Sequence, residues 1–201
     1  MGDSLNGKVR DWAYAKRGQR VYLRDKAGRA VGKGECWDLA EEALAKSGAK
    51  TSNDLGTVTP DSNYVWGDPI GDVRQVIPGD ILQFRDHKVT TKTATKVTFR
   101  DGSWQTQVEE TFAKRGPQHT AIVNSRMAGD GSVEILEQHM RPTPGVRLNR
   151  VYLTEANPAQ PPKKSETHKN PTTGKLETAE VTTTVTISVE GTVWAYRPQS
   201  R

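Results

Sequence analysis

The stretch GKGECWDLAEEALAKSG, residues 32 to 48, contains the only cysteine of this 201-residue chain. Cys36 follows a glycine-containing turn and stands at the first position of a predicted helix that ends at Gly48. A thiol attacks as its thiolate, and the dipole and free amides of a helix N-terminus lower the pKa of a cysteine there. A single cysteine excludes an internal disulfide and a cysteine-rich zinc site. Its position suits either a nucleophile or a small buried hydrophobic side chain.

A nucleophilic cysteine needs a base, and the base needs a group that orients it. His119 opens the predicted strand HTAIV, and alternation along SVEILEQHM places Glu137 and His139 on one face of the next strand. Taken singly, His119 suits a turn histidine and Glu137 suits a solvated strand end. Together with Cys36 they have the residue types of a Cys-His-Glu triad.

Other roles for the histidines are also open. His87 and His168 lie in polar segments, and we expect them at the surface. A zinc site made of Cys36, His119 and His139 is a third hypothesis, although one ligand on a helix start and two on strands lack the short spacing of metal motifs. No metal or other cofactor is therefore expected.

The elements that must position these residues run from helices to strands. Residues 7–18 and 36–48 have the spacing of amphipathic helices, and Trp37, Ala40 and Ala43 share the buried face of the second. Strands are predicted near residues 80–85, 119–125, 132–139 and 191–197, between Gly and Pro residues. This order predicts an α+β fold in which N-terminal helices pack on an antiparallel sheet.

Two Thr-rich segments interrupt this plan. Residues 88–113 alternate Thr with apolar residues around Asp101-Gly102, and residues 163–190 do so around a turn near 170–174. We expect each segment to be a long hairpin inserted in a single domain, residues 1–201, and pairing between the two hairpins is one arrangement open to them. Their hydrogen-bonding faces suit a protein partner or the border of a substrate site.

Composition limits the partners and the compartment. The chain is 33% hydrophobic and 26% charged, as is typical of soluble globular proteins. No run approaches the roughly 18 apolar residues of a membrane span, and the first residues lack the apolar core of a signal peptide, so we expect a cytoplasmic location. The net charge of +5 lies mostly before Cys36, where residues 1–33 carry nine Lys and Arg against three Asp. Without an interleaved aromatic motif this is a solvated face, and no nucleic-acid partner is expected.

Four motifs in order carry a family resemblance. The series GECWDLAEEAL, PGDILQF, HTAIV and VEILEQH resembles the CHAP amidohydrolase/peptidase family and its NlpC-type relatives, which share a papain-like cysteine peptidase core. More narrowly, GECWDLAEEAL and the later YRP resemble the cysteine-proteinase-fold domain of fungal cortical actin patch proteins and bacterial relatives. The resemblance covers roughly residues 8–155 and 191–198 and leaves out the Thr-rich segments.

The resemblance implies roles for individual residues. Cys36 would be the nucleophile, His119 the general base and later acid, and Glu137 the group that holds the imidazole in the useful tautomer. The backbone N–H of Cys36 would help to form the oxyanion hole. The sequence neighbours expected to support this site are Glu35, Trp37, Gln138 and His139.

Two of these supporting residues depart from the family pattern. CHAP enzymes often have Gln where this chain has Glu35, and an ionised carboxylate beside a developing oxyanion opposes catalysis unless it points away. They often have Asn where this chain has His139.

Two functions remain open at this stage. The first is a cysteine hydrolase that cleaves an amide, peptide or isopeptide bond through an acyl-thioester, with a peptide, peptidoglycan-like or protein substrate. The second is a catalytically idle papain-like fold that acts as a protein-interaction module. Intact Cys36, His119 and Glu137 favour the first, whereas Glu35 and the polar hairpins allow the second.

Overall fold

A computed structural model describes residues 4–18, 20–21, 24–25, 30–56, 58–59, 62–139, 145–156 and 158–201. The helices are α1 (Leu5–Tyr14), α2 (Cys36–Ser47) and α3 (Ser52–Leu55), and a 3₁₀ turn, η1, spans Val73–Gln75. The strands are β1 (Arg20–Val21), β2 (Arg24–Asp25), β3 (Asp68–Ile70), β4 (Ile81–Thr98), β5 (Trp104–Val123), β6 (Ser132–Glu137), β7 (Arg147–Tyr152), β8 (Lys164–Lys169) and β9 (Leu176–Arg197). Within these residues no helix is long and apolar enough to cross a membrane.

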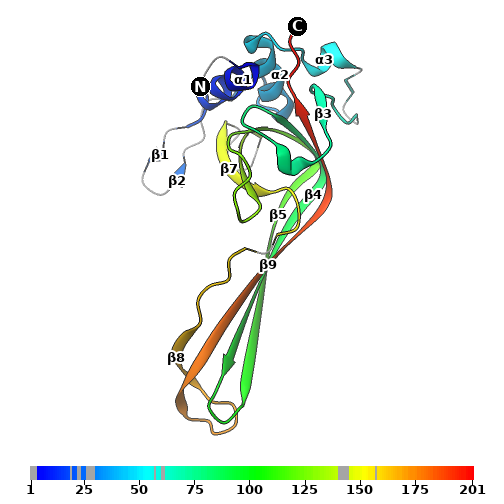
Figure 1. Cartoon of the computed structure of the whole chain (residues 1–201). Coiled ribbons are helices and arrows are strands. Elements are labelled where there is room, and N and C mark those ends of the chain that lie inside the picture. Colours follow the sequence, from blue (N-terminus) through cyan, green and yellow to red (C-terminus); the bar gives the residue numbers. More distant parts are fainter. Residues whose placement is uncertain are drawn as a thin grey trace.

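The main sheet is antiparallel and has the strand order β3-β9-β4-β5-β6-β7, with β8 beside β9 (Figure 1). The helices gather at one end of the molecule, against this sheet (Figure 1). The predicted order of helices followed by an antiparallel sheet is confirmed. The strands predicted near residues 80–85, 119–125, 132–139 and 191–197 fall in β4, β5, β6 and β9.

Helix α2 packs its apolar stripe against one face of the sheet. Its buried residues are Leu39, Ala40, Ala43 and Leu44. They form one core with Val9 and Ala13 of α1 and with Ile81, Ile122 and Leu136 of the sheet. The adjacent strand residues Leu82, Ala121 and Ile135 enter a second core on the other face, because successive side chains alternate. The start of α2 thus lies against β5 and beside the end of β6.

Strands β4, β5 and β9 continue past the core into a long projection, here called the arm (Figure 1). It comprises residues 88–98, 104–114 and 176–190, with β8 along β9. The strands of the two Thr-rich segments are thus continuous with core strands, and β9 pairs with β4 along the arm. At the junction the register shifts after Arg85, where Asp86 has a φ of 51° and Gly191 one of 85°. A side chain on Gly191 would collide with the backbone of Asp86, so glycine is required where β9 crosses this bulge.

The expectation that His87 lies at the surface is wrong. The bulge at Asp86 redirects the following residue, and the His87 ring is buried with Nε2 3.1 Å from the carbonyl oxygen of Tyr152. Burial is the main cause that lowers the pKa of His87 to about 4. The hydrogen bond to the backbone of Tyr152 raises this pKa, whereas the positive charge of Arg115 lowers it further. His87 is therefore a neutral core residue. His168 is partly exposed, with Nε2 3.4 Å from Oε2 of Glu166.

The buried carboxylate of Asp80 connects the N-terminal helix to the C-terminal strand. Its oxygens accept hydrogen bonds from Nδ2 of Asn6 at 2.7 Å, the backbone N–H of Ile77 at 2.8 Å and Nη2 of Arg197 at 3.1 Å. The neighbouring Gly79 lies so close to the carbonyl of Asn6 that a Cβ would overlap it. The turn before β4 thus fixes α1 and the end of β9.

Replacing Asp80 by Asn should lower the free energy of unfolding by about 2–3 kcal/mol, because buried and partly buried donors lose a charged acceptor. Urea unfolding followed by circular dichroism measures this loss as a lower midpoint. Asp11→Asn is the control, since Asp11 is exposed and pairs with Arg10 at the surface, and it should change stability by less than about 0.5 kcal/mol. Equal losses in the two variants would contradict the anchoring role of Asp80.

Candidate active site

A tight turn brings the chain into the N-terminus of α2 and presents Cys36. Oδ2 of Asp38 accepts hydrogen bonds from the backbone N–H groups of Lys33, at 2.7 Å, and Glu35, at 3.1 Å, and so closes the turn. Gly32 has a φ of 58°, and an added Cβ would meet the carboxyl carbon of Asp38 at 2.7 Å. Glycine is therefore the residue that this approach to the helix permits.

Gln138 holds the same turn from the sheet. It is fully buried, its Oε1 accepts a hydrogen bond from the backbone N–H of Val31 at 2.9 Å, and its Nε2 donates to the carbonyls of Val31 and Glu35. Gln138 directly follows Glu137 at the end of β6. One strand end thus carries both a carboxylate for the histidine and an amide that fixes the segment before Cys36.

The thiol of Cys36 interacts with the imidazole of His119 and with the backbone N–H groups of Thr120 and Trp37, and each of these interactions favours the thiolate. Burial raises the pKa of Cys36, but the interactions with His119 and with the backbone of Thr120 and Trp37 together outweigh burial and bring the pKa below its ordinary value. Burial lowers the pKa of His119, whereas its bonds to Cys36 and Glu137 raise it to about 9. Both shifts favour a thiolate–imidazolium pair at neutral pH.

The carboxylate of Glu137 is completely buried and has four donors. Its Oε2 lies 2.8 Å from Nε2 of His119 and 2.9 Å from Nε of Arg115. Its Oε1 accepts from Nη2 of Arg115 at 3.1 Å and from Nδ2 of Asn149. Burial raises the pKa of Glu137, but the hydrogen bond of His119 and the charge of Arg115 hold it well below its usual range. Because Nε2 of His119 is hydrogen-bonded to the ionised carboxylate, Nδ1 is the ring nitrogen that remains for the thiol.

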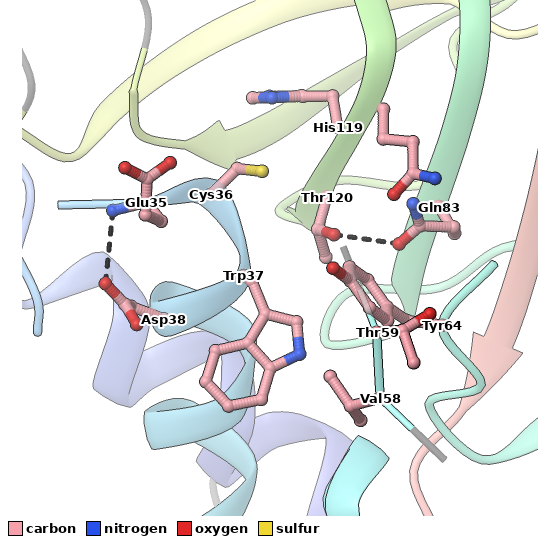
Figure 2. Close-up of a pocket in the computed structure, with 11 residues that line it drawn as sticks. Glu35, Cys36, Trp37, Asp38, Val58, Thr59, Tyr64, Gln83, His119 and Thr120 are labelled. Carbon is pink, nitrogen blue, oxygen red and sulfur yellow. Dashed lines mark hydrogen bonds between the residues drawn. The ribbon is translucent and has the colours of Figure 1, made fainter. Parts of the chain in front are cut away.

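The remaining predicted residues lie around this chain of contacts. Glu35 and His139 are both exposed, with Oε2 of Glu35 3.3 Å from Nδ1 of His139. The carboxylate of Glu35 points away from the sulfur of Cys36 (Figure 2). His139 therefore does not join Cys36 and His119 as a ligand. Across the described part of the chain no group of three or more His, Cys, Asp or Glu side chains could hold a metal ion.

A cleft of about 520 Å³ opens beside the sulfur (Figure 2). Its lining residues are Glu35, Cys36, Trp37, Asp38, Val58, Thr59, Tyr64, Gln83, Gln118, His119 and Thr120. The rings of Trp37, Tyr64 and Trp66 form a cluster with centroids 5.9–6.5 Å apart. Oε1 of Gln83 accepts from Nε1 of Trp66 at 3.1 Å and from Oγ1 of Thr120 at 2.8 Å, which ties the cluster to the sheet.

Sequence reasoning brought together the cysteine, the histidine and the carboxylate but missed their supports. Arg115 and Asn149, which hold Glu137, and Gln83, in the cleft wall, were not among the predicted site residues. Arg115 lies in KRGPQ, next to the Thr-rich segment, where a basic residue carries no sign of burial. Gln83 interrupts the apolar run ILQF. A polar residue within a predicted buried strand was the one feature of the sequence that could have identified Gln83 as part of the site.

The few helices and the large antiparallel sheet are consistent with a cysteine-proteinase fold. The sequence model of the AIM3/BBC1 Cysteine proteinase-fold domain matches residues 13–201, and the chain therefore belongs to that family. The matched range includes both Thr-rich segments. Neither the curated proteins nor the solved structures contain a significant match to the chain.

Alkylation of Cys36 by iodoacetamide should be faster at about pH 6 than that of an ordinary thiol, because the lowered pKa leaves a larger fraction of the thiol ionised. In His119→Ala the pKa of the thiol should rise, and alkylation at about pH 6 should slow by at least about tenfold. Intact-mass spectrometry over a pH series measures the rates, and His168→Ala is the control on a partly exposed histidine. A wild-type rate that follows an ordinary thiol pKa and ignores the His119 change would contradict the ion pair.

Arg115→Met should move the acid limb of Cys36 alkylation to higher pH by about one unit. Without the guanidinium the pKa of Glu137 rises, so Glu137 becomes neutral at a higher pH, His119 loses its anchor and the thiolate loses its counter-ion. Arg115→Lys keeps the positive charge but not the bidentate hydrogen bond, so its acid limb should lie between those of the wild type and Arg115→Met. Lys114→Met, on the exposed neighbour, is the control. An acid limb that is unchanged in both Arg115 variants would show that Arg115 does not act through Glu137.

Proposed function

We propose that the protein is a cysteine hydrolase that cleaves an amide, peptide or isopeptide bond through an acyl-thioester. The observation that carries this proposal is the continuous contact from Cys36 through His119 to the buried Glu137, at the edge of an open cleft. A structural cysteine needs neither an imidazolium partner nor a lowered pKa. The pattern of a nucleophile, a base and a group that orients the base is that of nucleophilic catalysis.

In the proposed reaction the thiolate of Cys36 attacks the carbonyl carbon of the scissile bond. The backbone N–H of Cys36 is a donor for the developing oxyanion. Protonated His119 then gives its proton to the leaving amine, and the acyl group stays on the sulfur. Neutral His119 next takes a proton from water, which attacks the thioester and releases the acid. Glu137 keeps the imidazole oriented and stabilises its charged form in each half of the cycle.

The cleft supports a peptide-like or acyl-amide substrate. Its volume lies in the range of small-molecule and peptide sites, and its walls combine aromatic rings with amide and hydroxyl groups. Trp37 and Tyr64 suit an apolar substrate side chain, whereas Gln118 and Thr59 suit the backbone of a peptide. A peptide, peptidoglycan-like chain or protein meets this description. The exposed Glu35, which pairs with His139, leaves the oxyanion position free of its charge.

The finer classification belongs to the same proposal. The site is of the CHAP/NlpC type, and residues 1–201 work as one domain in the cytoplasm. Residues 88–113 and 163–190 are additions to the catalytic core that serve a protein partner. The idle-fold alternative shares all of this except turnover, so turnover decides between them.

Two reagents test turnover. A panel of peptidyl vinyl sulfones should add one equivalent to Cys36, and a library of fluorogenic peptide amides should contain a substrate. Cys36→Ala should abolish both reactions, and Glu137→Gln should lower kcat by about 10²-fold or more. Glu155→Gln, an exposed carboxylate outside the cleft, is the matched control and should change kcat by less than about twofold. Fast alkylation of Cys36 with no turnover across the library would favour the interaction module and overturn the hydrolase.

A further inference from the structure

The arm has one covered edge and one bare edge. Along β9 the backbone groups of Ile187 exchange hydrogen bonds with Ala156, and those of Val185 bond the side-chain amide of Gln160. Along β5 the strand β6 pairs only at Ile122 and Val123, and no described segment pairs with the outer edge of residues 104–114. Every residue of that stretch is exposed. The β5 edge is thus open to a further strand.

The phase of the hydrogen bonds shows which groups this edge presents. The backbone N–H of Phe99 donates to the carbonyl of Ser103, so odd-numbered residues of β5 face β4 in the arm. Bonding alternates along an antiparallel pair, and the even-numbered residues therefore point their N–H and C=O groups outward. Nothing in this stretch, such as a proline, removes one of these donors.

The same even-numbered residues carry an exposed apolar stripe. Trp104, Val108 and Phe112 are 60%, 50% and 67% exposed, and their spacing of four places them on one face. Nζ of Lys96 lies 5.5 Å from the Trp104 ring centroid, and Nζ of Lys114 lies 5.5 Å from that of Phe112. Most natural edge strands are short, covered or interrupted by charge. This edge is long and uncovered, and its charged residues are Glu109, Glu110 and Lys114, so an apolar stripe with two aromatic side chains remains exposed beside it and marks an interface.

We propose that the protein forms a symmetric dimer in which residues 104–112 of β5 pair antiparallel with the same residues of a second copy, centred on Val108. In this register Val108 lies opposite Val108 of the second chain. Trp104 of each chain lies opposite Phe112 of the other. Five outward-facing residues from each copy then form about ten backbone hydrogen bonds. All three exposed apolar side chains gain apolar neighbours.

The charges fit this register. Glu110 faces Thr106 of the second copy, which has Lys96 beside it on β4, while Lys92 lies 3.8 Å from Glu110 within its own chain. On the other face Gln107 opposes Glu109, an amide donor against a carboxylate. No like charges are directly opposite, whereas a dimer centred on Glu109 or Glu110 would place two carboxylates face to face.

Dimers centred on other residues of β5 would pair a shorter part of the exposed edge. A dimer centred on Phe112 leaves Trp104 beyond the paired region. Because the strands are antiparallel, the register centred on Val108 sends the two cores to opposite ends of the joined arms. About eleven residues separate Val108 from His119, so the two sites lie on the order of 70 Å apart and both clefts stay open.

Multi-angle light scattering after gel filtration tests the dimer. The wild-type chain should have twice the mass of one chain at tens of micromolar, and Val108→Glu, which opposes two carboxylates, should weaken dimerisation by at least about tenfold. Thr184→Glu is the matched control, since Thr184 is an exposed residue on the same face of the arm, in register with Ala94 on β4. It should leave the dimer intact. Cys36 alkylation should be unchanged in both variants, which shows that the core is folded.

A cysteine at the centre tests the register. In a Cys36→Ser background, Val108→Cys should form an intermolecular disulfide under mild oxidation, because a hydrogen-bonded antiparallel pair has a Cα separation of about 5.5 Å. Thr106→Cys, on the same face but opposite Glu110, should cross-link at least about tenfold more slowly. A monomeric wild-type chain, a dimer that survives Val108→Glu, or equal cross-linking of the two cysteines would each overturn the proposal.

Discussion

The buried carboxylate of Glu137 is the constraint on which the rest of the site depends. A charge removed from water is tolerated only when it is paired and hydrogen-bonded, and Arg115, His119 and Asn149 meet that requirement completely. The contact that keeps His119 charged and oriented is therefore also one of the contacts that make the burial of Glu137 possible. Because every lone pair of the carboxylate is engaged by donors from β5 and β7, the imidazole of His119 is held in one orientation.

Strand β6 sets the positions of Cys36 and His119 relative to each other. Glu137 faces His119, and the next residue, Gln138, faces the other way and holds the turn before Cys36. Successive residues of a strand point to opposite faces, so two adjacent side chains reach two separate parts of the site. The sulfur then receives one amide from the helix and one, that of Thr120, from the sheet. The pKa of Cys36 is lowered despite burial because the fold places these donors and His119 around the same sulfur.

Local patterns predicted elements better than they predicted contacts. Helical spacing located α2, and polar residues at the ends of apolar strands brought Cys36, His119 and Glu137 into one hypothesis whose members the structure places in contact. Arg115 and His87 gave no such signal, since their burial depends on a bulge where strands distant in sequence meet. Bulge positions are determined by pairing between those strands and are not encoded in the alternation of any one of them. For the same reason the passage of β4, β5 and β9 from core to arm was not predicted.

The bulge at Asp86 also separates the registers of the two parts of the sheet. In the core Ile81 faces Ile122, whereas beyond the bulge the pairing of β4 with β5 is offset by one residue. Pairing within the arm therefore does not decide which core residues face each other. Removing two residues from each of the three long strands between the bulge and the tip shortens the arm and preserves the alternation on both sides of the junction. The length of the arm can thus change in evolution without altering the relative positions of Cys36 and His119.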